Sequence, residues 1–137
     1  MQVTNRTILQ ALPALEGLGS NRLPWNVSLQ IAKLKKELKD LAEPIEETRQ
    51  KLIGQYAQKD ADGKQKITED GKGIFLTDGV AFQAEQKALM DETVEVKSAK
   101  ITVSATVAST CDKCNHNMDK PLEIEPNILE ALIDFLE

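Results

Sequence analysis

The stretch "IAKLKKELKDLAEPIEETRQKL", residues 31–52, carries the strongest structural signal in the sequence. Apolar residues recur along it at alternating steps of three and four, the spacing that places side chains on one face of a helix. The repeating positions are Ile31, Leu34, Leu38, Leu41, Ile45, Thr48 and Leu52, followed by Tyr56. The pattern predicts a long helix that begins near residues 25–28.

This apolar seam has two interpretations. It can pack against other helices of the same chain, or it can form an intermolecular coiled coil. Pro44 favours the first, because a proline removes one backbone hydrogen bond and clashes with the carbonyl four residues earlier. We therefore expect the helix to kink near residues 40–44 or to divide there. In the second interpretation, the residues that would contact a partner chain are Ile31, Leu34, Leu38, Leu41, Ile45 and Leu52.

A shorter helix is expected before the long one. Thr4 or Asn5 can provide its N-cap, and Gly17 or Gly19 its stop. Pro13 should bend this helix or shorten it. Its inward residues are Ile8, Leu12 and Leu15.

Beyond the long helix, the composition shifts to a segment rich in Asp, Gly and Lys. This segment predicts a short hairpin that pairs residues 65–69 with 73–77. Thr77 or Asp78 should then cap a third helix. The residues of that helix expected to point inward are Phe82 and Leu89.

The clearest strand signal lies between residues 94 and 107. Apolar and polar residues alternate over 101–107, which indicates one buried face and one wet face. Val94 and Val96 have the opposite parity, so a bulge or bend is expected near residues 97–99. Residues 121–125 supply a candidate antiparallel partner. The inward residues are Ile101, Val103, Ala105 and Val107.

A short helix is expected at the C-terminus. Glu125 and Pro126 open it, because proline suits the first helical position. The apolar stripe of this helix is Leu129, Leu132, Ile133 and Leu136.

These elements predict a single domain over residues 1–137 in the α+β class. Residues 1–57 form its helical part, and residues 58–137 contribute a hairpin, a helix, a strand hairpin and the C-terminal helix. We expect the long kinked helix and the shorter helices to pack on a small antiparallel sheet with a projecting β-hairpin.

The composition argues against a nucleic-acid partner and against a membrane protein. Asp and Glu number 22 against 17 Lys and Arg, which gives a net charge of -5. This balance works against direct binding to a phosphate backbone, and few aromatic residues are present to stack on bases. No stretch approaches the roughly 20 apolar residues of a membrane helix. We expect a soluble protein in the cytoplasm of the cell that makes it, with no membrane or nucleic-acid partner.

The stretch "TCDKCNHNMD", residues 110–119, holds both cysteines and the one histidine. At the tip of the strand hairpin, Cys111, Cys114 and His116 can aim three ligands at one zinc ion, but a structural site needs a fourth. A carboxylate or a second chain would have to supply it. The alternatives are a redox dithiol, which would need a helix N-terminus after a strand, and a polar hairpin end with reduced, unligated cysteines. No other cofactor is indicated.

Other chemical motifs are weak. Asp60, Asp62 and Glu69 fall at calcium-loop spacing, but the first ligand position would be Gln58, and an Asp-Gly turn explains the same residues. The sequence has neither a G-x-S-x-G stretch nor a phosphate-binding glycine loop. We expect a protein that is not an enzyme.

Three segments also resemble a known group. They are "VTNRTILQALPALEGL", "LPWNVSLQIAKLKKELKDLAEPIEETRQKLIGQYAQKDADGK" and "ILEALIDFLE", of which "EETRQKLIGQYAQKDADGK" is the most specific part. Together they resemble small uncharacterised proteins encoded in tailed-phage and prophage genomes. The resemblance implies a phage product and carries no activity or catalytic residue. The long hairpin between Ile101 and Glu125 departs from the pattern of the group.

Three functions are therefore expected from the sequence. The first is a non-enzymatic phage protein that acts through contacts with other phage or host proteins, as a small virion or morphogenesis component and as a candidate homo-oligomer. It would be made in the host cytoplasm and carried in the virion if it is structural. The second is an acidic inhibitor of a host defence or nucleic-acid enzyme. The third is a zinc-stabilised regulatory module.

Overall fold

A computed structural model describes residues 1–69, 71–104, 106–110 and 117–137 of the chain. The described residues form four α-helices, one short 3-10 helix and two pairs of antiparallel strands. In chain order these are β1 (Gln2–Thr4), α1 (Asn5–Gly19), α2 (Trp25–Tyr56), α3 (Gly79–Asp91), β2 (Thr93–Glu95), β3 (Thr106–Thr110), β4 (Asn117–Pro121), α4 (Pro126–Leu132) and η1 (Ile133–Phe135). The α+β class is therefore confirmed.

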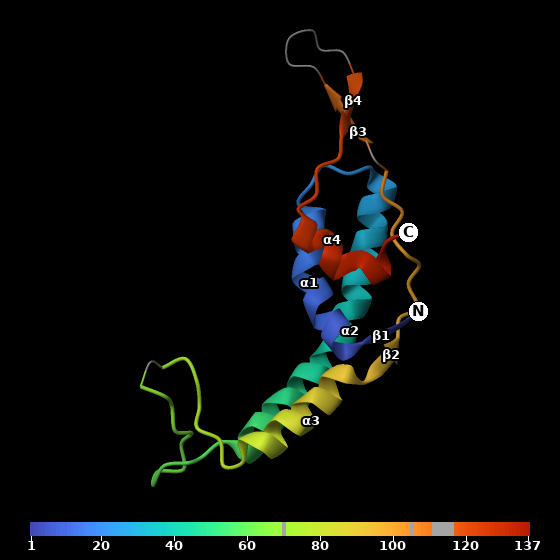
Figure 1. Ribbon diagram of the computed structural model, residues 1–137. Coiled ribbons are helices and arrows are strands. Elements are labelled where there is room, and N and C mark those ends of the chain that lie inside the picture. Colours follow the sequence, from blue (N-terminus) through green and yellow to red (C-terminus); the bar gives the residue numbers. More distant parts are fainter. Residues whose placement is uncertain (70, 105, 111–116) are drawn as a thin grey trace.

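Figure 1 shows a central body with a projection at each end. In the body, α1 packs against both α2 and α4. The later part of α2 leads away from the body with α3 running back beside it, and the β3–β4 pair extends from the opposite end (Figure 1). We call the first projection the distal arm and define it as residues 46–56 of α2, the described residues of 57–78, and α3.

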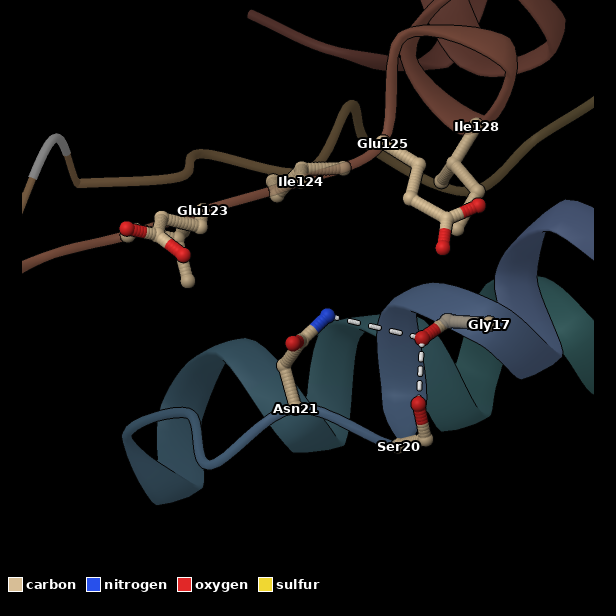
Figure 2. Close-up of a pocket in the computed structure, with 8 residues that line it drawn as sticks. Gly17, Ser20, Asn21, Glu123, Ile124, Glu125 and Ile128 are labelled. Atoms are coloured by element: carbon tan, nitrogen blue, oxygen red, sulfur yellow. Dashed lines mark hydrogen bonds between the residues drawn. The ribbon is translucent and has the colours of Figure 1, made fainter.

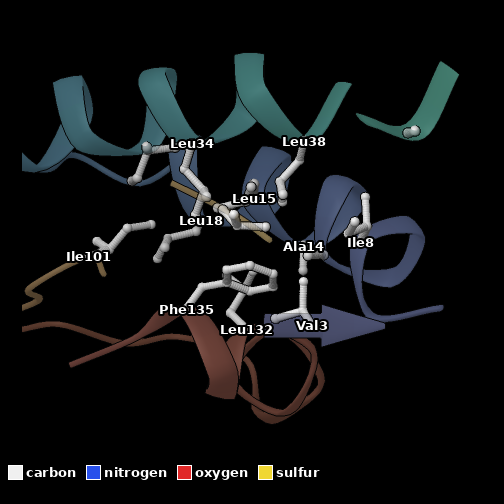
Figure 3. Close-up of a cluster of buried hydrophobic side chains, with 14 of the residues drawn as sticks. Val3, Ile8, Ala14, Leu15, Leu18, Leu34, Leu38, Ile101, Leu132 and Phe135 are labelled. Carbon is white, nitrogen blue, oxygen red and sulfur yellow. The ribbon is translucent and has the colours of Figure 1, made fainter. Parts of the chain in front are cut away.

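The core is built mainly between helices. Figure 3 shows side chains from α1, α2 and α4–η1 meeting in one cluster, which also includes Val3 of β1 and residues of the chain between β2 and β3. Its fully enclosed members are Ile8, Ala11, Leu15, Leu18, Leu34, Leu38, Val96, Ile101, Leu132 and Phe135. The expected packing of the helices on a sheet is present only in part: α1 contacts β1, whose Val3 is buried, but the helices mainly cover one another.

The helix starts follow the capping residues. The side chain of Thr4 accepts a hydrogen bond from the backbone N–H of Thr7 and caps α1, and the side chain of Asp78 accepts one from Ala81 and caps α3. Glu125 and Pro126 begin α4 as expected. Pro13 does not shorten α1, which continues to Gly19.

Helix α2 is a single element of 32 residues that runs through Pro44. Of the two expected outcomes, the helix does not divide, and Figure 1 shows its axis changing direction part-way along. Pro44 leaves the carbonyl of Asp40 without its usual helical donor, and because both residues are exposed, water can bind that carbonyl while the bend relieves the clash with the ring.

The predicted strand over residues 94–107 was only partly correct. β2 stops at Glu95 and pairs with β1, whereas β3 starts at Thr106 and pairs with β4. Between them, Ile101 makes one parallel bridge to Leu136, with its N–H donating to the carbonyl of Phe135 at 2.8 Å. Ile101 is therefore buried through its contact with the C-terminus and not within a continuous strand, and Ala105 lies outside the described residues.

The partner of β3 also differs from the prediction. Asn117–Pro121 pairs with β3, in place of residues 121–125, and Thr106 lies opposite Pro121. Proline has no N–H to continue the ladder, so it suits the last position of the strand. Residues 122–125 then lead to α4.

A carboxylate fixes the expected bend at residues 97–99. The side chain of Glu37 on α2 accepts hydrogen bonds from the backbone N–H of Lys97 (2.7 Å) and of Ser98 (2.9 Å), and from the hydroxyl of Ser98. Burial alone would raise the pKa of Glu37, but these hydrogen bonds outweigh it and hold the pKa below its ordinary value. The bend is thus attached to the middle of α2 by one side chain.

Among the described residues, none of the helices combines the length and the apolar composition needed to cross a membrane.

Core packing predicts the effect of a leucine truncation on α2. Leu34 is 0% exposed and Leu29, on the same helix, is 46% exposed. Leu34→Ala should lower the free energy of unfolding by about 2–5 kcal/mol, because it leaves a cavity, and Leu29→Ala by less than about 1 kcal/mol. Urea unfolding of the three proteins measures both, and equal losses would contradict this core.

The Glu37 contact predicts a pH dependence. Glu37→Gln should lower the free energy of unfolding at pH 7 by about 1–2 kcal/mol, since hydrogen bonds to a charged group are replaced by neutral ones at a partly exposed site. Because the pKa is depressed in the folded state, this contribution is present above the unfolded-state pKa of about 4.3 and is lost as pH falls through the folded-state pKa.

Unfolding measured from pH 7 to pH 3 provides the check. The gap between the wild type and Glu37→Gln should close toward acid pH. Glu47→Gln, an exposed change on the same helix, should leave the curve near that of the wild type. A gap that stays constant with pH would contradict the role of the carboxylate.

Candidate functional site

In the distal arm, α3 and the last part of α2 cover each other along one side only. No residue of α3 is buried, and Phe82 and Leu89, which were expected to point inward, are each partly exposed. The rings of Tyr56 and Phe82 meet edge to face, with centroids 6.0 Å apart. The hydroxyl of Tyr56 donates to Glu85 at 3.0 Å, and this hydrogen bond raises the pKa of Tyr56. These contacts hold α3 against the last turns of α2.

At its base, the arm is attached to the start of α1. The buried Asn5 donates from its side chain to the carbonyl of Leu89 (2.8 Å), and its backbone N–H donates to Glu92 (2.9 Å). Beside it, Arg6 forms an exposed ion pair with Asp91. The side chains of Lys87 and Arg6 lower the pKa of Asp91 through hydrogen bonds. Sequence reasoning identified Asn5 only as a possible cap and missed this anchoring role.

At the end of the arm, three extended segments, around Gln58, Lys66 and Phe75, hydrogen-bond to one another. The backbone N–H of Gln58 donates to Phe75, that of Phe75 to Lys66, and that of Lys66 back to Gln58, at 2.8–3.1 Å. The expected pairing of residues 65–69 with 73–77 is present as a single bridge, Ile67 to Ile74. Each segment therefore hydrogen-bonds to both of the others.

The segment with calcium-loop spacing forms a turn around Asp60 and Gly63. The carboxylate of Asp60 accepts hydrogen bonds from the backbone N–H of Asp62 and of Lys64, both at 2.9 Å. Gly63 has a φ of 80°, the left-handed conformation that glycine adopts without strain. The Asp-Gly turn, expected as the alternative to a calcium loop, accounts for these residues.

An apolar hollow lies on this end of the arm. Ile53 of α2 and the bridged pair Ile67 and Ile74 line it, and its volume is about 560 Å³. Ile67 is 61% exposed although it is aliphatic. Lys64 and Lys72 also line the hollow, and none of the described residues that line it is acidic. The hollow thus combines apolar surface with positive charge. We call it the arm hollow.

A second hollow, of about 680 Å³, lies between the end of α1 and the segment before α4. Figure 2 shows Glu125 and Ile128 extending toward α1 across it. The hydroxyl of Ser20 donates to the carbonyl of Gly17 at 2.6 Å, and the amide of Asn21 donates to the same oxygen at 3.4 Å. The side chains of Ser20 and Asn21, which follow α1, therefore cap the end of that helix, and the glutamates offer acceptor oxygens.

Gly17 allows this close approach of α1 and α4. A Cβ at Gly17 would lie 2.7 Å from the Cδ1 of Ile128, so any side chain there would displace the isoleucine.

A comparison with protein-family models, curated protein sequences and solved structures finds no match. Function is therefore inferred from the chain's own residues.

The residues of the apolar seam lie in the body and along α2. Five of them are buried and Leu41 packs against the core, which corresponds to the first interpretation of the seam. Contact of the seam with a partner chain stays a prediction, and it would require the core to open. The residues concerned are Ile31, Leu34, Leu38, Leu41, Ile45 and Leu52.

Cys111, Cys114 and His116 lie outside the described residues, between β3 and β4 in the sequence. Within the described ranges, no group of three or more His, Cys, Asp or Glu side chains is placed to hold a metal ion, a search that does not include these three. Zinc binding stays a prediction. Metal analysis of the purified protein and of Cys111→Ser with Cys114→Ser tests it.

The predicted stripe of the C-terminal helix was partly wrong. Leu132 is buried and Leu136 is partly buried, whereas Leu129 is 41% exposed and Ile133 is 71% exposed. The reason is that the buried face of this segment is Ile128, Leu132 and Phe135, at helical steps of four and three, which turns Leu129 and Ile133 outward. Two aliphatic side chains are therefore left on the surface.

The anchor at the base of the arm predicts the effect of changing Asn5. Asn5→Ala should lower the free energy of unfolding by about 1–3 kcal/mol, because the carbonyl of Leu89 loses its side-chain donor in a partly buried site. Arg6→Ala, which removes an exposed ion pair, should cost less than about 1 kcal/mol. Denaturant unfolding compares them, and a larger loss for Arg6→Ala would contradict the anchoring role of Asn5.

Proposed function

We propose that this chain is a non-enzymatic phage protein that acts through protein–protein contacts, as a small virion or morphogenesis component. The observation that supports the proposal most is the arm hollow. Apolar side chains grouped in one exposed patch mark interaction sites more often than single exposed ones do, and here Ile67 lies with Ile53 and Ile74 at the end of a projecting arm. A projection with an apolar, charged end is suited to reach a partner.

The second projection supports the same proposal. An isolated two-stranded pair is marginally stable in water, and β3–β4 extends from the body with no third strand among the described residues. A partner that packs on the pair or adds a strand to it would stabilise it. The partners proposed are other phage proteins or host proteins.

An acidic inhibitor is the second candidate function. The C-terminal segment, residues 122–137, contains five acidic residues and no basic one. Such a surface would compete for the basic groups of a nucleic-acid enzyme. The acidic residues are Glu123, Glu125, Glu130, Asp134 and Glu137.

The composition of particles tests the leading proposal. Quantitative mass spectrometry of purified particles and of assembly intermediates, from the phage that encodes the chain, should find it at a fixed copy number. Ile67→Asn should reduce its incorporation, because the arm hollow loses apolar contact area. Val80→Asn, a matched change at an 83% exposed site on the same arm, should not.

Two results would contradict the proposal. One is absence of the chain from both particles and intermediates. The other is recovery of the chain with a host nucleic-acid enzyme whose activity it blocks, which would favour the inhibitor.

A further inference from the structure

The arm hollow and the exposed face of α4–η1 both present aliphatic side chains. The hollow carries basic residues, whereas the face carries acidic ones. Ile53, Ile67 and Ile74 line the hollow together with Lys64 and Lys72. On α4–η1, two exposed aliphatic side chains lie four residues apart and are interleaved with two exposed acidic ones. These are Leu129 and Ile133, with Glu130 and Asp134.

The two surfaces cannot meet within one chain. Leu129 and Ile133 lie on the body, and the hollow lies at the far end of the arm (Figure 1). The other side of α4–η1 is already occupied, because Leu132 and Phe135 are enclosed in the core. The exposed face is therefore available only to another molecule.

We propose that the arm hollow of one copy binds the exposed face of α4–η1 of a second copy. This inference rests on the proposed function and names the partner as another copy of the chain. The hollow is open to solvent and presents three isoleucines against which the two aliphatic side chains can pack. Glu130 and Asp134 would then face the side of the hollow that carries Lys64.

The contact joins two different surfaces, so it is heterologous. After the first contact forms, one copy keeps a free face and the other keeps a free hollow, so the pair can bind further copies at both ends. Head-to-tail contacts of this kind close into rings or continue as filaments, according to the rotation between copies. The expected assembly is therefore larger than a dimer at high concentration.

Three single variants of the full-length chain separate this arrangement from others. Ile67→Asn changes the hollow, Ile133→Asn changes the face, and Val80→Asn is the control elsewhere on the arm. All three positions are more than half exposed, so the fold should be retained. Sedimentation velocity measures the size distribution up to about 1 mM chain, a range that covers micromolar to millimolar dissociation constants.

The wild type and Val80→Asn should assemble beyond the dimer as concentration rises. Ile67→Asn and Ile133→Asn alone should each associate at least about tenfold more weakly, since an aliphatic contact is lost. An equal mixture of the two should form dimers and nothing larger, because one variant keeps an intact hollow and the other an intact face.

A wild type that stays monomeric over the whole range would overturn the inference. A mixture that stays monomeric while the wild type forms dimers only would also overturn it, because that result indicates a symmetric contact. Neither result bears on the presence of the chain in particles, so the proposed function is judged separately by particle composition.

Discussion

The length of α2 is the constraint on which the rest of the structure depends. At 32 residues the helix is about 48 Å long, whereas α1, with 15 residues, spans about 22 Å. The helices of the body can therefore enclose only the first part of α2, from Val27 to Ile45. The remainder needs a second cover, which α3 provides from one side. A body with a projecting arm follows from this mismatch.

Much of the fold could be predicted from local sequence. The caps Thr4 and Asp78, the opening of α4 at Pro126 and the buried seam of α2 all have short-range signals that the structure confirms. The errors arose where contacts distant in sequence decide the conformation. Ile101 looked like part of a strand, but it is buried because it bridges Leu136, 35 residues later.

The candidate site was far less predictable. The arm hollow joins Ile53 of a helix to Ile67 and Ile74 of a bridged turn region, and no spacing rule links three such positions. Ile133 was assigned to a buried stripe, because helical spacing allows two neighbouring apolar stripes in this segment and only packing on α1 selects Ile128, Leu132 and Phe135. Cys111, Cys114 and His116 had the strongest chemical signal in the sequence, and they lie outside the described residues.

The central claim is that the chain has one well-covered body and one arm that is covered on a single side. Native-state hydrogen exchange tests it most directly, because exchange reports the free energy of local opening. Amides of α1 and of residues 31–42 should exchange at the slow rate set by global unfolding, and those of α3 on the order of 10–100 times faster. Protection of α3 equal to that of α1 would contradict the account.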